Sequence, residues 1–256
     1  MRKVAICGKG GSGKSSIVAL LANELRKRGW QVLVVDSDES NMGLARMLGF
    51  EGRPAPLLEL VGGKKQVMSA FSDAPQGPMG VLQQEHIHVS ELPAQYVLER
   101  DGIRMVSVGK ILQSLEGCAC PMGVLSREFL GRLVLGEREI VLVDTEAGVE
   151  HFGRGVERSL DTVLAVTEPS FDALELAAKI TSLAVELGIP RIGAVLNQVP
   201  SPAVGELLSA ELRKRGVAVL GAIRLDPEVF ETGLQGAPIR GSLAEKDMAV
   251  LVDEML

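Results

Sequence analysis

Short apolar runs alternate with amphipathic segments along most of the chain. The runs are rich in Val, Ile and Leu, which is typical of strands buried on both faces of a sheet. We expect strands at residues 3–7, 32–36, 103–108, 140–144, 162–167, 191–197 and 217–223. Apolar residues at helical spacing predict helices at 14–28, 122–135, 171–187, 204–215 and 243–256. This alternation implies an α/β fold with a doubly wound, mostly parallel sheet and helices on both faces.

Residues 51–100 depart from this pattern. Proline and glycine recur through the segment, and neither strand nor helix periodicity extends across it. We interpret it as an irregular excursion from the sheet, in the form of a short hairpin, and not as a second domain. The chain is therefore predicted to form a single domain over residues 1–256. Because aromatic residues make up only 3% of the sequence, its core must be largely aliphatic.

A glycine-rich turn joins the first predicted strand to the first predicted helix. Its Gly-x-x-x-x-Gly-Lys-Ser spacing is met by Gly8, Gly13, Lys14 and Ser15. Such a loop points successive backbone N–H groups at phosphate oxygens, and the helix N-terminus adds partial positive charge. Lys14 is placed to reach the β- and γ-phosphates, and the Ser15 hydroxyl to ligate Mg²⁺. A chance match is the alternative, but the flanking strand and helix disfavour it.

The charge balance narrows the range of partners. The chain has 33 acidic and 27 basic residues, for a net charge of −6, whereas nonspecific nucleic-acid binders usually carry a basic surplus. Residues 245–256 are acidic and apolar and lack the basic polar face of a membrane-binding helix. We therefore expect no nucleic-acid partner and no membrane partner. Three cysteines and no predicted signal peptide indicate a cytoplasmic protein.

The phosphate loop carries a second lysine, Lys9, directly after its first glycine. The run Lys9-Gly10-Gly11-Ser12-Gly13-Lys14-Ser15-Ser16 resembles the deviant Walker A loop of the MinD and nitrogenase iron protein group of ATPases. The resemblance implies that the loop from Gly8 to Ser16 binds ATP and that Lys9 and Lys14 act in catalysis. It also implies a homodimer in which Lys9 crosses the interface to the partner's nucleotide. An ordinary solvated surface charge is the alternative for Lys9.

Two further segments fit the same resemblance. Asp36 and Asp38 lie in a segment similar to switch I, which implies that Asp38 positions the attacking water and that Asp36 lies near Mg²⁺. Asp144 ends an apolar strand, as a Walker B acid does, and Gly148 follows in a segment similar to switch II. The resemblance implies that Asp144 holds the Mg²⁺ water shell and that the Gly148 N–H senses the γ-phosphate. Taken singly, each aspartate fits a helix N-cap or turn residue equally well.

The preferred base is indicated less directly. Asn197 ends a predicted strand, at a position where members of the group use an asparagine on the adenine edge. The aspartate of a guanine-selective Asn-Lys-x-Asp motif is missing, so ATP is favoured over GTP. A structural turn residue is the alternative interpretation of Asn197.

Cys118 and Cys120 stand directly before a predicted helix. Two thiolates are half of a tetrahedral site, and a symmetric dimer would bring two pairs together around Zn²⁺ or, in tetragonal geometry, Ni²⁺. The alternative is that both are small buried hydrophobes, as many free cysteines are. Cys7, within the first strand, is predicted to be a core residue.

The Cys-x-Cys pair and the run from Asp144 to Gly155 together resemble the CooC-type ATPases that support maturation of carbon monoxide dehydrogenase. This resemblance implies a nickel metallochaperone in which ATP hydrolysis switches a Cys118/Cys120 site at the dimer interface. The implied client is a nickel enzyme, either carbon monoxide dehydrogenase or acetyl-CoA synthase. A spatial-organising ATPase like MinD or ParA, and an electron-transfer ATPase with a bridging iron–sulfur cluster, are the alternatives.

Overall fold

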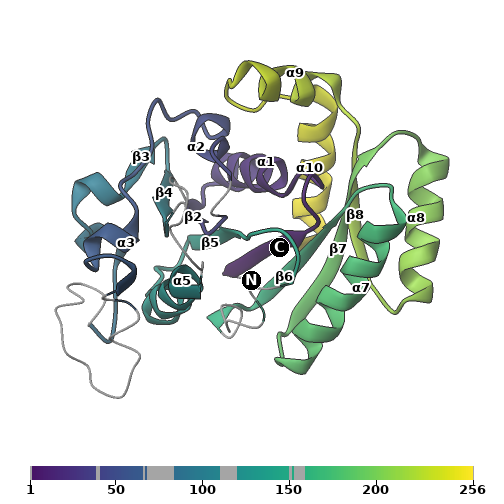
Figure 1. The fold of residues 1–256 in the computed structure, drawn as a ribbon. Helices are drawn as coiled ribbons and strands as arrows, with labels where there is room; N and C mark the ends of the chain where they lie inside the picture. The colour runs from purple at the N-terminus through teal and green to yellow at the C-terminus, as the bar shows by residue number, and fades with distance from the viewer. Residues whose placement is uncertain are drawn as a thin grey trace.

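The computed structural model describes residues 2–38, 41–65, 67, 84–109, 120–149, 152 and 159–255. Its strands form one sheet in the order β3-β4-β2-β5-β1-β6-β7-β8 (Figure 1). Neighbouring strands run parallel except for β3 and β4. The strand bounds are β1 Lys3–Gly8, β2 Gln31–Asp36, β3 Leu98–Arg100, β4 Ile103–Ser107, β5 Glu139–Asp144, β6 Thr162–Thr167, β7 Arg191–Val199 and β8 Val219–Arg224. The predicted doubly wound, mostly parallel sheet is confirmed.

Helices cover both faces of this sheet (Figure 1). One layer contains α1 Lys14–Lys27, α2 Leu44–Met47 and α10 Ser242–Met255. The other contains α3 Leu57–Leu60, α5 Cys120–Arg132, α7 Phe171–Glu186 and α8 Pro202–Lys214. The five helices expected from periodicity are all present, and each end lies within three residues of its expected position.

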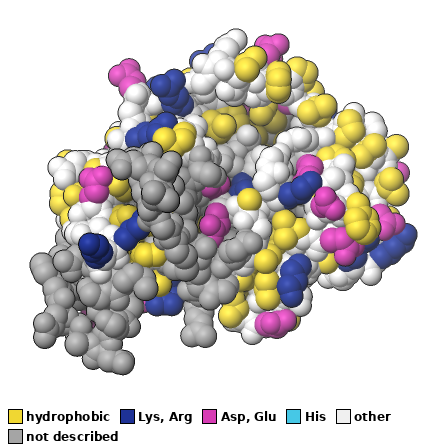
Figure 2. All heavy atoms as spheres, viewed as in Figure 1, with side chains coloured by type: hydrophobic (Ala, Val, Ile, Leu, Met, Phe, Trp, Pro, Cys, Tyr) yellow, Lys and Arg dark blue, Asp and Glu magenta, His cyan; other side chains and the backbone are white. Residues whose placement is uncertain are grey.

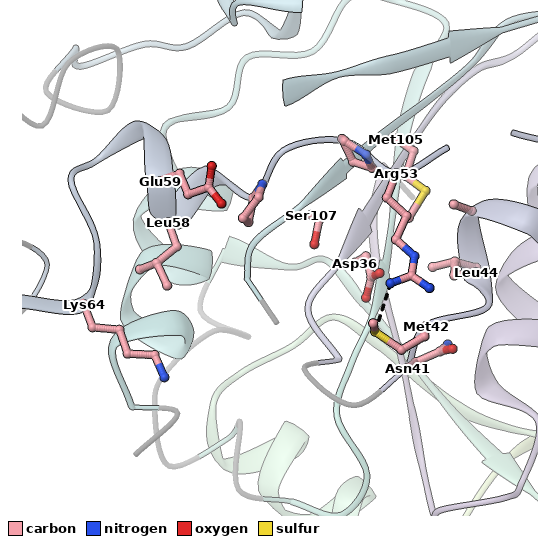
Figure 3. Close-up of a pocket in the computed structure, with 13 residues that line it drawn as sticks. Asp36, Asn41, Met42, Leu44, Arg53, Leu58, Glu59, Lys64, Met105 and Ser107 are labelled. Carbon is pink, nitrogen blue, oxygen red and sulfur yellow. Dashed lines mark hydrogen bonds between the residues drawn. The ribbon is translucent and has the colours of Figure 1, made fainter. Parts of the chain in front are cut away.

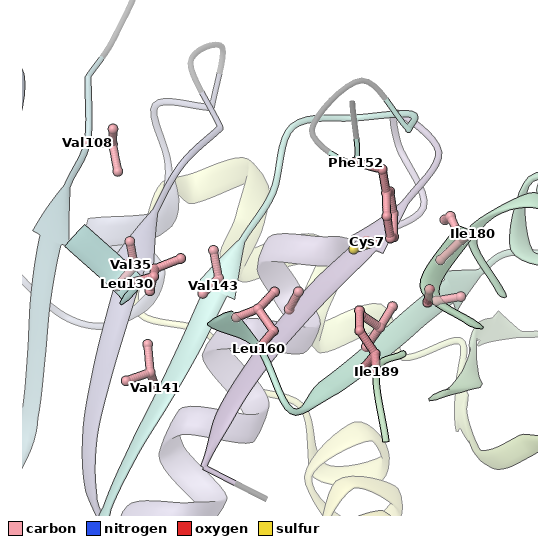
Figure 4. Packing of buried hydrophobic residues seen from close by; sticks show 14 of the residues in the cluster. Cys7, Val35, Val108, Leu130, Val141, Val143, Phe152, Leu160, Ile180 and Ile189 are labelled. Carbon is pink, nitrogen blue, oxygen red and sulfur yellow. The ribbon is translucent and has the colours of Figure 1, made fainter. Parts of the chain in front are cut away.

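Alternation along each strand divides the core into two clusters. Ile6, Val34 and Leu142 pack toward α1 and α10. Cys7 and Val143 point the other way, into the cluster seen in Figure 4. Cys7 is fully buried there, as the sequence predicted. Because side chains of successive strand residues face opposite sides, an unbroken apolar run serves both layers.

Residues 51–100 contribute one strand, β3, which the hydrophobic pattern of the sequence did not predict. β3 pairs antiparallel with β4 through a turn at Asp101 and Gly102, whose φ angles are 49° and 81°. Asp-Gly is the sequence that such a left-handed two-residue turn favours, so the signal was present. The same segment holds α3 and two 3₁₀ turns, Val89–Glu91 and Ala94–Tyr96.

Helix α9, Pro227–Gln235, was also not predicted. Its N-cap is Asp226, whose Oδ1 accepts a hydrogen bond from the Glu228 N–H at 3.0 Å. No α9 residue is fully buried, Phe230 and Leu234 are exposed, and Val229 packs against the core only partly buried, so the helix presents a weak apolar pattern. Figure 2 shows hydrophobic side chains at this end of the molecule, and it shows acidic and basic side chains interspersed across the visible face. Among the described helices, none is long and apolar enough to cross a bilayer.

The sheet topology determines where a site can form. β1 lies between β5 and β6, although the chain leaves β1 to build β2 two places away. Ligands in open parallel sheets bind at such switch points, beyond the carboxyl ends of the strands. The register pairs Asp144 with Ile6 on one side and with Asp36 on the other. The ends of β1, β2 and β5 therefore converge at one edge.

Candidate phosphate and magnesium site

The glycine-rich turn between β1 and α1 has a backbone that its glycines make possible. Gly8, Gly11 and Gly13 have φ angles of 149°, 82° and 87°, which L-residues with side chains rarely adopt. At Gly8 a Cβ would also lie 2.5 Å from the Val166 carbonyl oxygen. Lys14 is only 6% exposed, and its Nζ donates to the Lys9 carbonyl at 3.5 Å. The loop is thus closed tightly around a buried ammonium group.

Three aspartates are buried next to this loop. Asp36, Asp38 and Asp144 are 3%, 8% and 0% exposed. The Ser15 hydroxyl donates to Asp144 Oδ2 at 2.5 Å, which brings together residues from α1 and β5. Among the described residues, the other oxygen, Asp144 Oδ1, is buried and has no hydrogen-bond partner. A hydroxyl with carboxylates is the oxygen donor set that Mg²⁺ prefers, and the free Oδ1 fits a water of its coordination shell.

The charge of Asp144 is costly in this setting. Burial is the main cause that raises the pKa of Asp144 from 3.8 to about 7, and the nearby charge of Asp36 acts in the same direction. The Ser15 hydrogen bond and the Lys14 charge lower this pKa but do not offset the burial. A divalent cation would stabilise the ionised carboxylate at neutral pH.

Asn41 belongs to this cluster and was missed in the sequence. Its Nδ2 donates to Ser15 Oγ and also to Asp144 Oδ2, the latter at 3.3 Å. Its backbone N–H donates to Asp38 Oδ1 at 3.3 Å. Asn41 therefore connects the segment after β2 to the Ser15–Asp144 pair. The available signal was an amide-bearing residue three positions after Asp38, which is weak without the fold.

Lys9 is paired within its own chain. Its Nζ lies 3.3 Å from Glu168 Oε1 and 3.8 Å from Asp172 Oδ2. The Lys9 side chain is 38% exposed, so it is held at the surface and is not buried in the loop. The interface role that the resemblance implies would require Lys9 to leave these carboxylates.

Gly148 and Asn197 both contact the phosphate loop. The Gly148 N–H donates to the Gly8 carbonyl at 3.2 Å, so in this structure it is already engaged. Asn197 Nδ2 donates to the Ser12 carbonyl at 2.7 Å, and the Gln198 amide reaches the Gly11 carbonyl at 3.3 Å. Asn197 and Gln198 therefore hold the phosphate loop from the end of β7, and Gly148 holds it from the segment after β5. The γ-phosphate role of Gly148 and the adenine role of Asn197 remain predictions.

The cysteine site lies at the margin of what the structure describes. Cys118 is outside the described residues, and Cys120 is described only as the first backbone position of α5. In the described part of the chain, no group of three or more His, Cys, Asp or Glu is arranged to hold a metal ion. The shared thiolate site therefore stays a prediction.

The raised pKa of Asp144 leads to a test of stability against pH without magnesium and nucleotide. Folded Asp144 keeps its proton up to about pH 7, whereas an unfolded aspartate releases it near 3.8, so folding loses stability as pH rises through this window. We expect the advantage of Asp144→Asn over wild type in free energy of unfolding to grow by at least ~1 kcal/mol from pH 5 to 8. Urea unfolding measures this, with the exposed Asp253→Asn as control. Parallel pH profiles for wild type and Asp144→Asn would contradict the assignment.

Comparison with known proteins agrees with this geometry. Residues 3–239 match the CobQ/CobB/MinD/ParA nucleotide binding domain. An uncharacterized ATP-binding protein of Methanocaldococcus jannaschii is 40% identical over 98% of this chain and 99% of its own length. The carbon monoxide dehydrogenase accessory protein CooC of Rhodospirillum rubrum is 34% identical over 89% of this chain and 85% of its own.

The fold has solved counterparts. The septum site-determining protein MinD of Pyrococcus horikoshii, in a complex with Mg-ADP, superimposes with a TM-score of 0.71 at 19% identity, covering 99% of this chain and 95% of that one. At that identity the likeness concerns the fold alone. The family match spans most of the chain and includes the phosphate loop, the buried aspartates and the strands that carry them. The chain therefore belongs to the CobQ/CobB/MinD/ParA family of nucleotide-binding domains and is a P-loop ATPase.

Proposed function

We propose that this protein is a dimerising, magnesium-dependent ATPase that serves as a maturation factor for a nickel enzyme. The observation that carries the proposal is the 34% identity to CooC across 89% of the chain. That relative is named as an accessory protein of carbon monoxide dehydrogenase. The client enzyme here would be carbon monoxide dehydrogenase or acetyl-CoA synthase, and the cargo Ni²⁺, with Zn²⁺ as the alternative ion.

The nucleotide site supports the ATPase half of this proposal. The loop from Gly8 to Ser16 would cradle the phosphates, with Lys14 on the β- and γ-phosphates. Ser15, Asp36 and Asp144 would hold Mg²⁺, which supplies charge neutralisation as the γ-phosphoryl group departs. Asp38 would position the attacking water. Its hydrogen bond from Asn41 supports this role, because Asn41 also contacts Ser15.

The dimer half of the proposal depends on Lys9. ATP in the partner subunit would compete with Glu168 and Asp172 for the Lys9 ammonium group. Binding of ATP would then draw two subunits together and bring two Cys118/Cys120 pairs to the shared axis. Hydrolysis would return Lys9 to its own carboxylates, loosen the dimer and release the metal.

A second candidate function has its own support. An iron-sulfur cluster carrier protein of Methanocaldococcus jannaschii is 27% identical over 92% of this chain and 76% of its own length. A pair of cysteines from each subunit is also a suitable ligand set for an iron–sulfur cluster. The same thiolates would then bind iron and sulfide in place of Ni²⁺ or Zn²⁺.

The metal content of the purified protein tests the proposal. We expect about one Ni²⁺ or Zn²⁺ per two chains, bound only by the dimer and absent from the Cys118→Ser/Cys120→Ser variant. Elemental analysis of anaerobically purified protein measures this, with Cys7→Ala as the matched cysteine control. Iron with acid-labile sulfide would favour the cluster carrier. Equal metal content in wild type and the double variant would contradict both candidates.

The Lys9 contacts lead to a separate prediction about dimerisation. Glu168→Gln with Asp172→Asn frees Lys9, so dimerisation with a nonhydrolysable ATP analogue should strengthen at least about fourfold, because each subunit no longer has to break two partly exposed ion pairs of ~0.2–1 kcal/mol each. Sedimentation equilibrium measures the change. Lys9→Ala should instead stay monomeric while still binding the nucleotide.

The matched control for this test is Glu245→Gln. It breaks the 3.0 Å Lys27–Glu245 ion pair between α1 and α10, which does not involve the phosphate loop. It should leave dimerisation unchanged. A Lys9→Ala protein that dimerises normally with ATP would rule out the cross-interface role.

A further inference from the structure

A cavity of about 440 Å³ lies beside the cluster of Ser15, Asp36, Asn41 and Asp144, and outside the phosphate loop. It is bounded by α2, by the segment leading into α3, and by the ends of β2 and β4 (Figure 3). No residue of the loop from Gly8 to Ser16 lines it. Its volume falls within the range of about 300–1,000 Å³ that is usual for small-molecule sites. The nucleotide roles assigned above leave this cavity without a ligand.

The walls of the cavity are mainly apolar. Leu44, Leu58 and Met105 line it together with Pro54 and Pro56. Leu44, Met105 and Pro54 are buried, so these walls are fixed by packing within the domain. Such a surface suits the hydrocarbon body of a ligand.

Two polar groups of the cavity lack a strong partner. Ser107 is 5% exposed, and its Oγ has no hydrogen-bond partner in the described part of the chain. Arg53 is exposed, its guanidinium donates to the Met42 thioether sulfur at 3.2 Å, a weak acceptor, and it makes no ion pair with any described residue. Buried hydroxyls are normally hydrogen-bonded, and guanidinium groups favour carboxylates and phosphates.

The side chain of Arg53 indicates the sign of the ligand, because a guanidinium that donates to a thioether sulfur would be better satisfied by an anion. Arg53 and Lys64 enter from opposite sides of the cavity in Figure 3. Of the two lining carboxylates, Asp36 lies opposite Asp144 in the proposed Mg²⁺ site, and Glu59, which like Arg53 is exposed, makes no ion pair with Arg53. We propose that this cavity is a second ligand site, which binds a small organic carboxylate with its head on Arg53 and its apolar body against Leu58 and Met105. The proposal does not depend on the metal-delivery function.

Calorimetric titration with straight-chain carboxylates from butyrate to decanoate tests the proposal. Saturable binding should strengthen with chain length, and octanoate should bind at least about tenfold more tightly than neutral octanamide, because a charged hydrogen bond to Arg53 is lost in the amide. Arg53→Gln should abolish the preference for octanoate. Arg46→Gln is the matched control, since Arg46 is an exposed guanidinium on α2 that does not line the cavity.

Two further variants locate the binding. Leu58→Trp should fill part of the cavity and weaken octanoate without unfolding the protein, because Leu58 is only half-buried. Lys14→Ala should leave octanoate binding unchanged, which separates this cavity from the phosphate loop.

Three results would overturn the proposal. These are no saturable binding of any carboxylate in the series to folded wild type, equal affinity for octanoate and octanamide, and binding that is lost in Lys14→Ala but kept in Arg53→Gln. Binding of an acidic peptide in place of every carboxylate in the series would assign the cavity to a protein partner and would also overturn it. Circular dichroism of each variant shows whether it is folded.

Discussion

The buried carboxylate of Asp144 is the constraint on which the site depends. It lies at the end of a strand that is buried from Ile140 onward, accepts the Ser15 hydroxyl on one oxygen and leaves the other without a partner among the described residues. A charge placed there is expensive unless a cation shares it. Ser15 of α1, Asp36 at the end of β2 and Asn41 in the segment after β2 are arranged around this one group, and Mg²⁺ bound to a nucleotide would make its ionisation favourable.

The sheet brings these parts together. Parallel pairing of β2 with β5 sets Asp36 directly opposite Asp144, while β1, on the other side of β5, delivers the phosphate loop. The loop is then held from outside, by Asn197 on Ser12 and by Gly148 on Gly8. The register of the paired strands therefore determines that these segments, which lie far apart in the sequence, meet at one site. Because the buried aspartates follow the apolar residues at the strand ends, the charges gather at the edge of the sheet and the core itself stays apolar.

Much of this was predictable from local pattern. Apolar runs and helical spacing gave the parallel strands and the main helices, because burial on both faces leaves a clear signal. The phosphate loop was predictable because only glycine tolerates its backbone, and the Asp36 and Asp144 positions because each ends a buried strand. The features that the sequence did not predict depend on tertiary contacts. Asn41 joins the cluster only once β2 and β5 are paired, and the intrachain partners of Lys9 lie more than 150 residues away.

The most direct test of the account is calorimetric measurement of ATP binding, with Mg²⁺, to wild type and to Lys14→Ala. Of the two lysines of the phosphate loop, Lys14 is the buried one. Lys27, at the other end of α1, is exposed and serves as the control. The account predicts that wild type and Lys27→Ala bind ATP and that Lys14→Ala shows no measurable binding. Equal ATP affinity in Lys14→Ala and wild type would contradict it.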